Sequence, residues 1–182
     1  MQNKFAWIVT PDLPWDERKE MITTALESGI DHVLDLDDIE NIRKLGNVKI
    51  IANSDDADIY LVGINGEGDG VVELNDDFTD SIDIANAKKA KSEGKQVCAY
   101  IKITDKAHEQ LAVKLGSIVD YIILVGTDWT IIPLENIIAD LQKEDVEIIA
   151  AVRDVDGARV ALETLEHGTD GEIGRASCRE RV

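Results

Sequence analysis

Residues 96–125 read QVCAYIKITDKAHEQLAVKLGSIVDYIILV. An apolar run at Gln96–Ile103 is followed by a segment with helical spacing at Asp105–Leu115, and then by a second apolar run at Val119–Val125. Short apolar runs that alternate with amphipathic segments are typical of strand–helix–strand units around a parallel sheet. This stretch therefore predicts an α/β fold.

The same alternation continues in both directions along the chain. Strands are predicted at Phe5–Thr10, His32–Leu36, Val48–Ala52, Ile59–Ile64, Gln96–Ile103, Val119–Val125 and Val146–Val152, and a last strand begins at Thr169–Gly171. Helices are predicted at Trp15–Ser28, Ile82–Glu93, Asp105–Leu115, Leu134–Leu141 and Val155–His167, with a short one capped by Asp37 or Asp38 and running through Leu45.

The number of strand starts decides between two architectures. Eight starts favour a TIM-type (βα)8-like barrel that is truncated at its last strand. Only a turn separates Val48–Ala52 from Ile59–Ile64, so one crossover helix is missing and a doubly wound open sheet is the alternative. In both architectures the chemistry is expected where strands end, at the carboxyl-end edge of the sheet.

Composition excludes several classes of partner. The chain has 182 residues and a formal net charge of −18, whereas nucleic acids and anionic lipids attract clustered Lys and Arg. No apolar run approaches the roughly 20 residues that cross a bilayer, and no signal or transit peptide is visible. We expect a cytoplasmic protein with a small-molecule substrate, no nucleic-acid partner and no membrane partner. The oligomeric state and the reason for the acidity, including salt adaptation, stay open.

The end of the sequence differs from the rest. Residues 172–182, EIGRASCRERV, hold three arginines and a cysteine but no apolar periodicity. The string resembles the translation of a common sequencing adapter. We therefore predict a natural domain over residues 1–171, a non-native tail over residues 172–182, and a missing downstream portion. Within the domain, residues 63–80 are rich in Gly and Asp and are predicted to leave the core as an excursion.

One loop pairs a carboxylate with a large flat ring. Asp128 and Trp129 follow a buried strand, and together they can hold a polyol or a planar cofactor ring. The alternative is that Trp129 plugs the barrel mouth and Asp128 caps a turn. Glu135 and Asn136 follow in the first turn of the next helix, where acidic residues are common for dipole reasons alone. All four are candidate site residues.

Two basic residues stand at other strand ends. Lys102 is in phase with Cys98 and Tyr100, so it can point into a barrel, where a desolvated lysine can form a Schiff base. The alternative, which is more common for a lysine, is that Lys102 lies on the solvent-exposed side. Arg153 follows Val146–Val152 and can bind a carboxylate of a ligand, or can pair with a neighbouring aspartate instead.

Other motifs carry little chemistry. The histidines are dispersed and the cysteines, Cys98 and Cys178, have no metal-type or disulfide spacing, so no metal is expected. The glycines of residues 63–70 lack the G-x-G-x-x-G spacing of dinucleotide-binding loops.

Several blocks of the sequence resemble archaeal-type (type II) 3-dehydroquinate synthases. The blocks are Thr23–Gly29, Leu45–Ile50, Asp58–Val62, Asp128–Leu141 and Ala161–Gly171. The resemblance implies NAD-dependent oxidative deamination of 2-amino-3,7-dideoxy-D-threo-hept-6-ulosonate and closure of the ring to 3-dehydroquinate, without zinc. It also implies that a second half of similar length is absent here, so the NAD site can lie there and this chain alone is expected to be inactive.

The resemblance does not assign roles to residues of this half, so the site residues above are inferred from position. By position, Asp128 and Lys102 are the candidate catalytic residues, and Arg153, Trp129, Glu135 and Asn136 are the candidates for substrate binding. Two other functions are compatible with the residues alone: a Schiff-base aldolase that uses Lys102, and a non-catalytic metabolite-binding domain.

Overall fold

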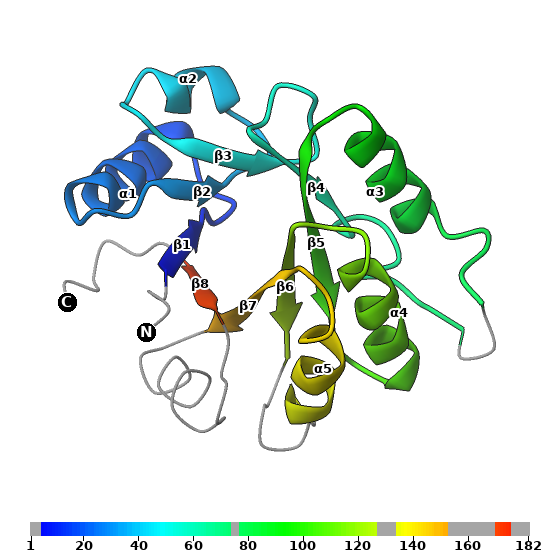
Figure 1. The fold of residues 1–182 in the computed structure, drawn as a ribbon. Helices are drawn as coiled ribbons and strands as arrows, with labels where there is room; N and C mark the ends of the chain where they lie inside the picture. The colour runs from blue at the N-terminus through cyan, green and yellow to red at the C-terminus, as the bar shows by residue number, and fades with distance from the viewer. Residues whose placement is uncertain (1–4, 74–76, 127–133, 153–169, 176–182) are drawn as a thin grey trace.

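The computed structural model describes residues 5–73, 77–126, 134–152 and 170–175, and these form a closed barrel of parallel strands surrounded by helices (Figure 1). The strands are β1 (Phe5–Val9), β2 (His32–Leu34), β3 (Lys49–Ala52), β4 (Ile59–Val62), β5 (Gln96–Lys102), β6 (Tyr121–Val125), β7 (Glu147–Val152) and β8 (Gly171–Arg175). The helices are α1 (Trp15–Glu27), α2 (Ile39–Arg43), α3 (Ile82–Ser92), α4 (Lys106–Gly116) and α5 (Leu134–Leu141).

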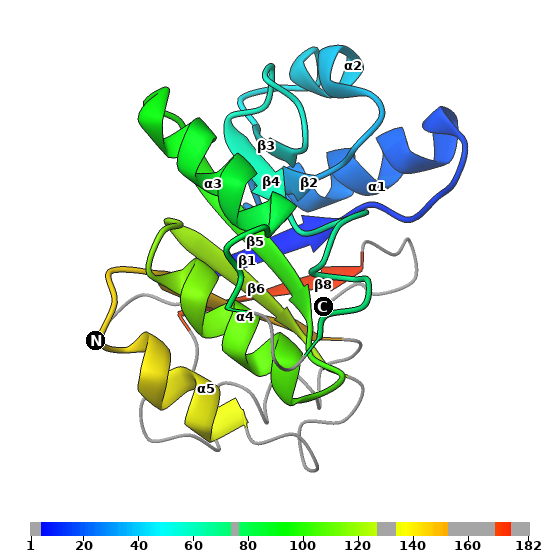
Figure 2. The same cartoon turned by 90° about the vertical axis from the view of Figure 1, so that its right-hand side faces the viewer.

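The strand order confirms the barrel and excludes the open sheet. Each strand pairs in parallel with the next one along the chain, and β8 pairs with β1 to close the ring. Figure 2 shows the helices on the outside of the strands. The predicted helix Val155–His167 lies outside the described residues.

The last strand is more complete than the truncated strand that we expected. β8 pairs with β1 from Phe5↔Gly171 to Val9↔Arg175, and with β7 on its other side. Residues 172–175 belong to the tail that we predicted to be non-native. Pairing does not depend on where a sequence comes from, so the domain boundary at residue 171 stays a prediction.

The break in the strand–helix rhythm is real. β3 ends at Ala52 and β4 begins at Ile59, with only a turn between them. Asp58 fixes this turn, because its Oδ2 accepts hydrogen bonds from the backbone N–H of Ile50 (2.9 Å) and from Arg43 (3.1 Å). The barrel thus closes without a helix over this connection.

The apolar side chains divide between the inside and the outside of the barrel. Alternate residues of each strand point inward because side chains alternate along a strand. The fully or nearly buried inner side chains are Trp7, Leu34, Ile51, Ile59, Leu61, Cys98, Ile123, Ile149 and Ile173. The intervening residues, such as Ile122 and Leu124, pack outward against the helices.

Aromatic rings fill the amino-terminal end of the barrel. The ring of Trp7 stacks on His32 at a centroid distance of 5.1 Å, and Tyr121 and Phe5 lie at 5.1 Å and 5.6 Å from Trp7. Gly171 lies beside them, because a Cβ at this position would stand 2.5 Å from the Phe5 ring. Aromatic side chains therefore close the end of the barrel at which the strands begin.

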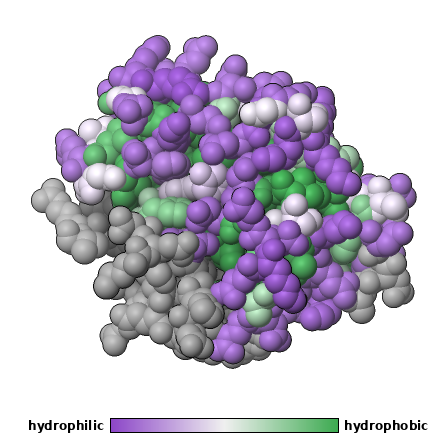
Figure 3. Space-filling model, viewed as in Figure 1, coloured by the Kyte–Doolittle hydropathy of each residue, from purple (hydrophilic) through white to green (hydrophobic). Residues whose placement is uncertain are grey.

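Most charged side chains of the described residues lie on the surface, whereas Arg18, Asp35, Asp83 and Glu109 are buried. Hydrophilic side chains cover most of the face drawn in Figure 3. Within the residues that the structure describes, no helix combines the length and the apolar character that a membrane crossing requires.

Candidate functional site

The carboxyl-terminal end of the barrel is lined by apolar side chains that are only partly buried. Val9, Ile64, Tyr100, Val125 and Ala151 pack against the inner core at this level. Leu36, just beyond β2, is 37% exposed. The deeper inner residues are nearly inaccessible. This end, which we call the barrel mouth, is where a parallel barrel places its chemistry.

Lys102 is the last residue of β5 and stands at the barrel mouth. It is in phase with Cys98 and Tyr100, both members of the inner cluster, and its side chain is exposed. Its backbone N–H donates to the carbonyl of Gly68 at 2.7 Å, which fixes the end of the strand. Lys102 thus keeps the phase of the inner residues, and its exposure corresponds to the alternative in which the lysine lies on the solvent side.

The glycine-rich segment packs against the end of β5. A Cβ on Gly63 or on Gly68 would stand 2.0 Å or 2.1 Å from the carbonyl oxygen of Tyr100, so no side chain fits at either position. The Gly68 N–H donates to the buried Asp83 carboxylate at 2.9 Å. The glycine-rich part of the predicted excursion, residues 63–70, thus packs over the ends of β4 and β5 at the barrel mouth.

His108 connects this segment to α4. Its ring is 2% exposed, with Nε2 at 3.1 Å from the Gly70 carbonyl and Nδ1 at 2.7 Å from Asp105 Oδ1. Asp105 also caps α4, because its carboxylate accepts the His108 backbone N–H at 2.9 Å. We expected the histidines to be structural and not to form a ligand cluster, and His108 has such a structural role because it holds residues 63–70.

Two acidic groups of this region, Asp83 and Tyr100, have raised pKa values. Burial raises the pKa of Asp83, the N–H of Gly68 opposes that rise, and the nearby Glu67 and Asp69 carboxylates add to it. Burial also raises the pKa of the Tyr100 hydroxyl, with a further contribution from the charge of Asp69. Asp69 therefore brings negative charge to the barrel mouth.

A buried ion pair lies beside the barrel mouth, between β1, β2 and α1. The Asp35 carboxylate accepts hydrogen bonds from Arg18 (2.6 Å), from Thr10 Oγ1 (2.7 Å) and from the backbone N–H of Asp37 (2.9 Å). Arg18 also pairs with Asp38. Burial tends to raise the pKa of Asp35, but these hydrogen bonds outweigh it and the pKa is lowered.

Sequence reasoning missed this ion pair. Asp35 directly follows the buried pair Val33 and Leu34, so the strand-end rule could have found it. Arg18 gave no signal, because an arginine on a helix is ordinarily exposed. The pair is in phase with the outer layer, which marks it as support for the rim of the barrel.

The predicted site residues are placed as follows. Asp128, Trp129 and Arg153 lie outside the described residues, so their grouping stays a prediction. Glu135 and Asn136 are exposed in the first turn of α5. Asn136 lines a groove between α4 and α5 on the helical layer, whereas Lys102 stands at the barrel mouth.

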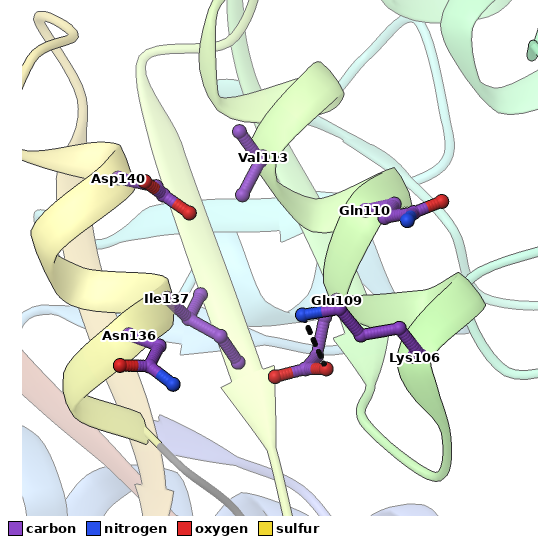
Figure 4. A pocket seen from close by; sticks show the side chains of 7 residues that line it. All are labelled: Lys106, Glu109, Gln110, Val113, Asn136, Ile137 and Asp140. Carbon is purple, nitrogen blue, oxygen red and sulfur yellow. Dashed lines mark ion pairs between the residues drawn. The ribbon is translucent and has the colours of Figure 1, made fainter.

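The groove between α4 and α5 has a volume of about 200 Å³. Figure 4 shows the Glu109 carboxylate between the two helices, with Val113 and Ile137 on opposite walls. Glu109 Oε2 lies 3.3 Å from Lys106 Nζ. Gln110, Asn136 and Asp140 complete the lining.

Metal-ligand clusters and free backbone N–H groups can be examined only within the described residues. These residues contain no group of three or more His, Cys, Asp or Glu that can hold a metal ion. In the Gly-rich segment, the N–H groups of Asn65, Gly66 and Gly68 are bonded to Asp69, Gly63 and Asp83, so these three are not free to hold a pyrophosphate. The N-termini of α3 and α4 are capped by their own Ser81 and Asp105.

The sequence matches the family model of the 3-dehydroquinate synthase II N-terminal domain over residues 3–175. The 3-dehydroquinate synthase of Methanobrevibacter smithii is 73% identical over 169 residues, which cover 93% of this chain and 46% of that protein. The synthase of Methanothermobacter thermautotrophicus is 62% identical over 170 residues, with coverage of 93% and 46%. The chain thus spans about half the length of the curated relatives it matches.

Two solved structures share the barrel. The 3-hexulose-6-phosphate synthase of Salmonella typhimurium has a TM-score of 0.59 at 18% identity, covering 94% of this chain and 88% of that chain. The HpcH/HpaI aldolase of Desulfitobacterium hafniense DCB-2 has a TM-score of 0.56 at 13% identity, covering 96% and 87%. At these identities the likeness concerns the fold alone.

Proposed function

Because this chain belongs to the 3-dehydroquinate synthase II family, we propose that it forms the N-terminal domain of an enzyme that makes 3-dehydroquinate for aromatic amino-acid biosynthesis. The proposed substrate is 2-amino-3,7-dideoxy-D-threo-hept-6-ulosonate, which is oxidatively deaminated with NAD and then closes its ring by an intramolecular aldol-type step. The observation that carries the proposal is the family match across residues 3–175.

The reaction needs a base for the amine and a second base that forms the enolate for ring closure. NAD, when bound, supplies the hydride acceptor for the amine-bearing carbon. The substrate also carries a carboxylate, which needs a cationic partner. Protein side chains must provide the two bases and the cation.

We assign these tasks to residues at the carboxyl ends of the strands. Asp128 and Lys102 are the proposed acid–base groups, Arg153 binds the substrate carboxylate, and Trp129 packs on the substrate. The exposed amine of Lys102 at the barrel mouth supports its assignment, because it can reach a ligand that is held on the partly buried apolar side chains lining the mouth. Glu135 and Asn136 have no step in this proposal, since Asn136 lines the α4–α5 groove.

We propose that the second half of the full-length protein holds most of the NAD. The proposal is supported by the Gly-rich segment, where the N–H groups of Gly66 and Gly68 are already bonded within the protein. No step of the chemistry is therefore assigned to a contact between NAD and this chain.

The test uses the full-length protein, the amino sugar and NAD, with NADH formation followed at 340 nm. We expect turnover by the full-length protein and none by the 182-residue chain alone. Absence of NADH with the full-length protein at every salt concentration tried would reject the proposed reaction.

Variants of Lys102 test the residue assignment. Lys102→Met in the full-length protein is expected to lower kcat by about 100-fold or more, as for the loss of an acid–base group. Lys88→Met, at an exposed position of α3, is the matched control and should leave kcat unchanged. Equal kcat values for the two variants would remove Lys102 from the mechanism without touching the proposed reaction.

A second function, a Schiff-base aldolase, is favoured by the inward register of Lys102. Against it, Schiff-base lysines are typically desolvated, whereas the Lys102 side chain is exposed. Borohydride treatment with a keto sugar separates the two functions. A covalent adduct on Lys102 would support the aldolase, and absence of an adduct together with NADH formation would support the synthase.

A further inference from the structure

The groove between α4 and α5 contains a carboxylate oxygen without a hydrogen-bond donor. The Glu109 side chain is 12% exposed, and its Oε1 is buried with no partner among the residues that the structure describes. A buried carboxylate oxygen that lacks a donor is energetically unfavourable, and a bound cation is one arrangement that would remove this cost. Oε1 is not accessible as it stands, so a donor in the groove reaches this oxygen when the carboxylate rotates about its Cγ–Cδ bond.

The existing partner of this carboxylate is weak. Lys106 Nζ lies 3.3 Å from Oε2, and the lysine side chain is 64% exposed. A pair of this kind, with one long exposed side chain, contributes little to stability. Asp140, which also lines the groove, lies 3.8 Å from Lys143, whose side chain is 77% exposed. Neither lysine is held in place, so an added cation can compete with both.

The lining of the groove defines what fits. Val113 and Ile137 form apolar walls, and Glu109 and Asp140 supply carboxylates from the two helices (Figure 4). The amides of Gln110 and Asn136 provide further acceptors. A cation on an aliphatic stem matches this arrangement, because methylene groups pack on the walls while the charged head donates to the carboxylates.

We propose that the α4–α5 groove binds an aliphatic ammonium or guanidinium group, with Glu109 as its main anionic partner. This inference is independent of the synthase reaction, because the groove is lined by the two helices and does not include Lys102. The cation comes either from a free amine or from a Lys or Arg side chain of the second half of the full-length protein.

The probe is n-butylammonium, titrated into the isotopically labelled 182-residue chain and followed by NMR. Saturable shifts are expected for the amides of Glu109 and Val113 and for the Ile137 methyl group, with a Kd of roughly 1–10 mM. Equal concentrations of n-butanol and of NaCl control for the apolar stem and for ionic strength. Neither control should produce saturable shifts in the groove.

Two variants and one matched control assign the binding to the groove. Glu109→Gln should weaken n-butylammonium about tenfold, because it replaces a charge-assisted hydrogen bond with a neutral one. Asp140→Asn, at an exposed position, should weaken it about twofold and stays informative if Glu109→Gln does not fold. Glu20→Gln removes one charge from an exposed position of α1 and should leave the affinity unchanged.

The same titration of full-length protein identifies the source of the cation. Equal affinity in both proteins indicates a free amine, whereas loss of binding only in the full-length protein indicates that its second half fills the groove. Absence of saturable shifts in the 182-residue chain, or equal affinity of the parent chain and both groove variants, would overturn the proposal.

Discussion

The Asp35 carboxylate accepts four hydrogen bonds. It receives a guanidinium, a hydroxyl and two backbone N–H groups, and it is 2% exposed. Such a buried ion pair is hard to replace one partner at a time, because the remaining charge is left buried. The pair therefore makes the rim between β1 and β2 sensitive to a single substitution.

We expect Asp35→Asn to lower the free energy of unfolding at pH 7 by about 3 kcal/mol, since Arg18 loses its buried counter-charge. Urea unfolding measures the change. Asp12→Asn, at an exposed position, is the control and should change the value by less than about 0.5 kcal/mol. Equal midpoints for the two variants would contradict the role of Asp35.

The Asp35→Asn variant also tests how the free energy of unfolding depends on pH. The pKa of Asp35 is lower in the folded chain than in the unfolded chain, so its stabilisation is complete above the unfolded value and is lost as the pH falls through the folded value. The difference in unfolding free energy between parent and Asp35→Asn should therefore be constant near neutrality and shrink below about pH 4. A difference that persists undiminished at pH 2 would show that lost packing, and not lost charge, destabilises the variant.

Among the secondary-structure elements, β5 joins the core to the barrel mouth. Its middle residues fill both faces of the sheet, and its end binds the glycine-rich segment through Tyr100 and Lys102. Gly68 belongs to that contact, whereas Gly94 has a positive φ of 81° and no atom within 4 Å of the position of a Cβ. Substitution of Gly68 therefore tests a steric contact, whereas substitution of Gly94 tests backbone strain alone.

Gly68→Ala is expected to lower the free energy of unfolding by about 2–3 kcal/mol, because the new Cβ would meet the Tyr100 carbonyl. Gly94→Ala should cost about 1 kcal/mol, since it meets only the strain of a left-handed backbone. Thermal unfolding of both variants provides the measurement. The reverse order of stabilities would mean that residues 63–70 yield easily and are not fixed against β5.

His108 gives a second test of how residues 63–70 are held. His108→Phe keeps an aromatic ring but removes both nitrogens, so the bond to the Gly70 carbonyl is lost. The Lys102 amide, which donates to Gly68, should then exchange its hydrogen about tenfold faster, in keeping with the loss of a buried hydrogen bond. His32→Phe retains a ring beside Trp7 and is the control. Unchanged exchange at Lys102 in His108→Phe would show that other contacts hold the segment.

The sequence predicts the strands well and their surroundings less well. Apolar runs locate β5 and β6 within two residues, although β6 starts at Tyr121 and not at Val119. The reason is Asp120, whose carboxylate accepts the Val97 N–H and ends the preceding turn. This contact joins residues far apart in the chain, and a pattern of neighbouring residues cannot contain it.

In the candidate site, too, the local sequence predicts some features, whereas others depend on tertiary packing. The position of Lys102 at a strand end could be predicted, because alternation and strand length fix it. The unpartnered oxygen of Glu109 could not, since it depends on how α4 and α5 pack together. The cap of α2 is a third case: Asp38 occupies the cap position, but the carboxylate that accepts the local N–H groups is that of Asp35.

Closure of the barrel depends on the chain as a unit, because its first and last described strands pair with each other. β8 gives β1 and β7 their second neighbours, in registers that run from Phe5↔Gly171 and Ile149↔Gly171. A shortened chain ending at residue 170 would leave both strands with open edges and would expose Trp7 and Ile149, which now lie in the inner core. Exposed strand edges with apolar side chains favour association between chains.

We therefore expect the chain ending at residue 170 to elute from a sizing column as aggregates or as an expanded species without a cooperative thermal transition. A chain ending at residue 175 keeps β8 and should elute and melt like the 182-residue chain. The five residues of β8 contribute only one buried apolar side chain, Ile173, so a large effect must come from the opened strand edges and the exposed Trp7 and Ile149. A cooperative, monomeric chain ending at residue 170 would mean that β1 and β7 tolerate open edges, and that strands β1 to β7 alone specify the fold.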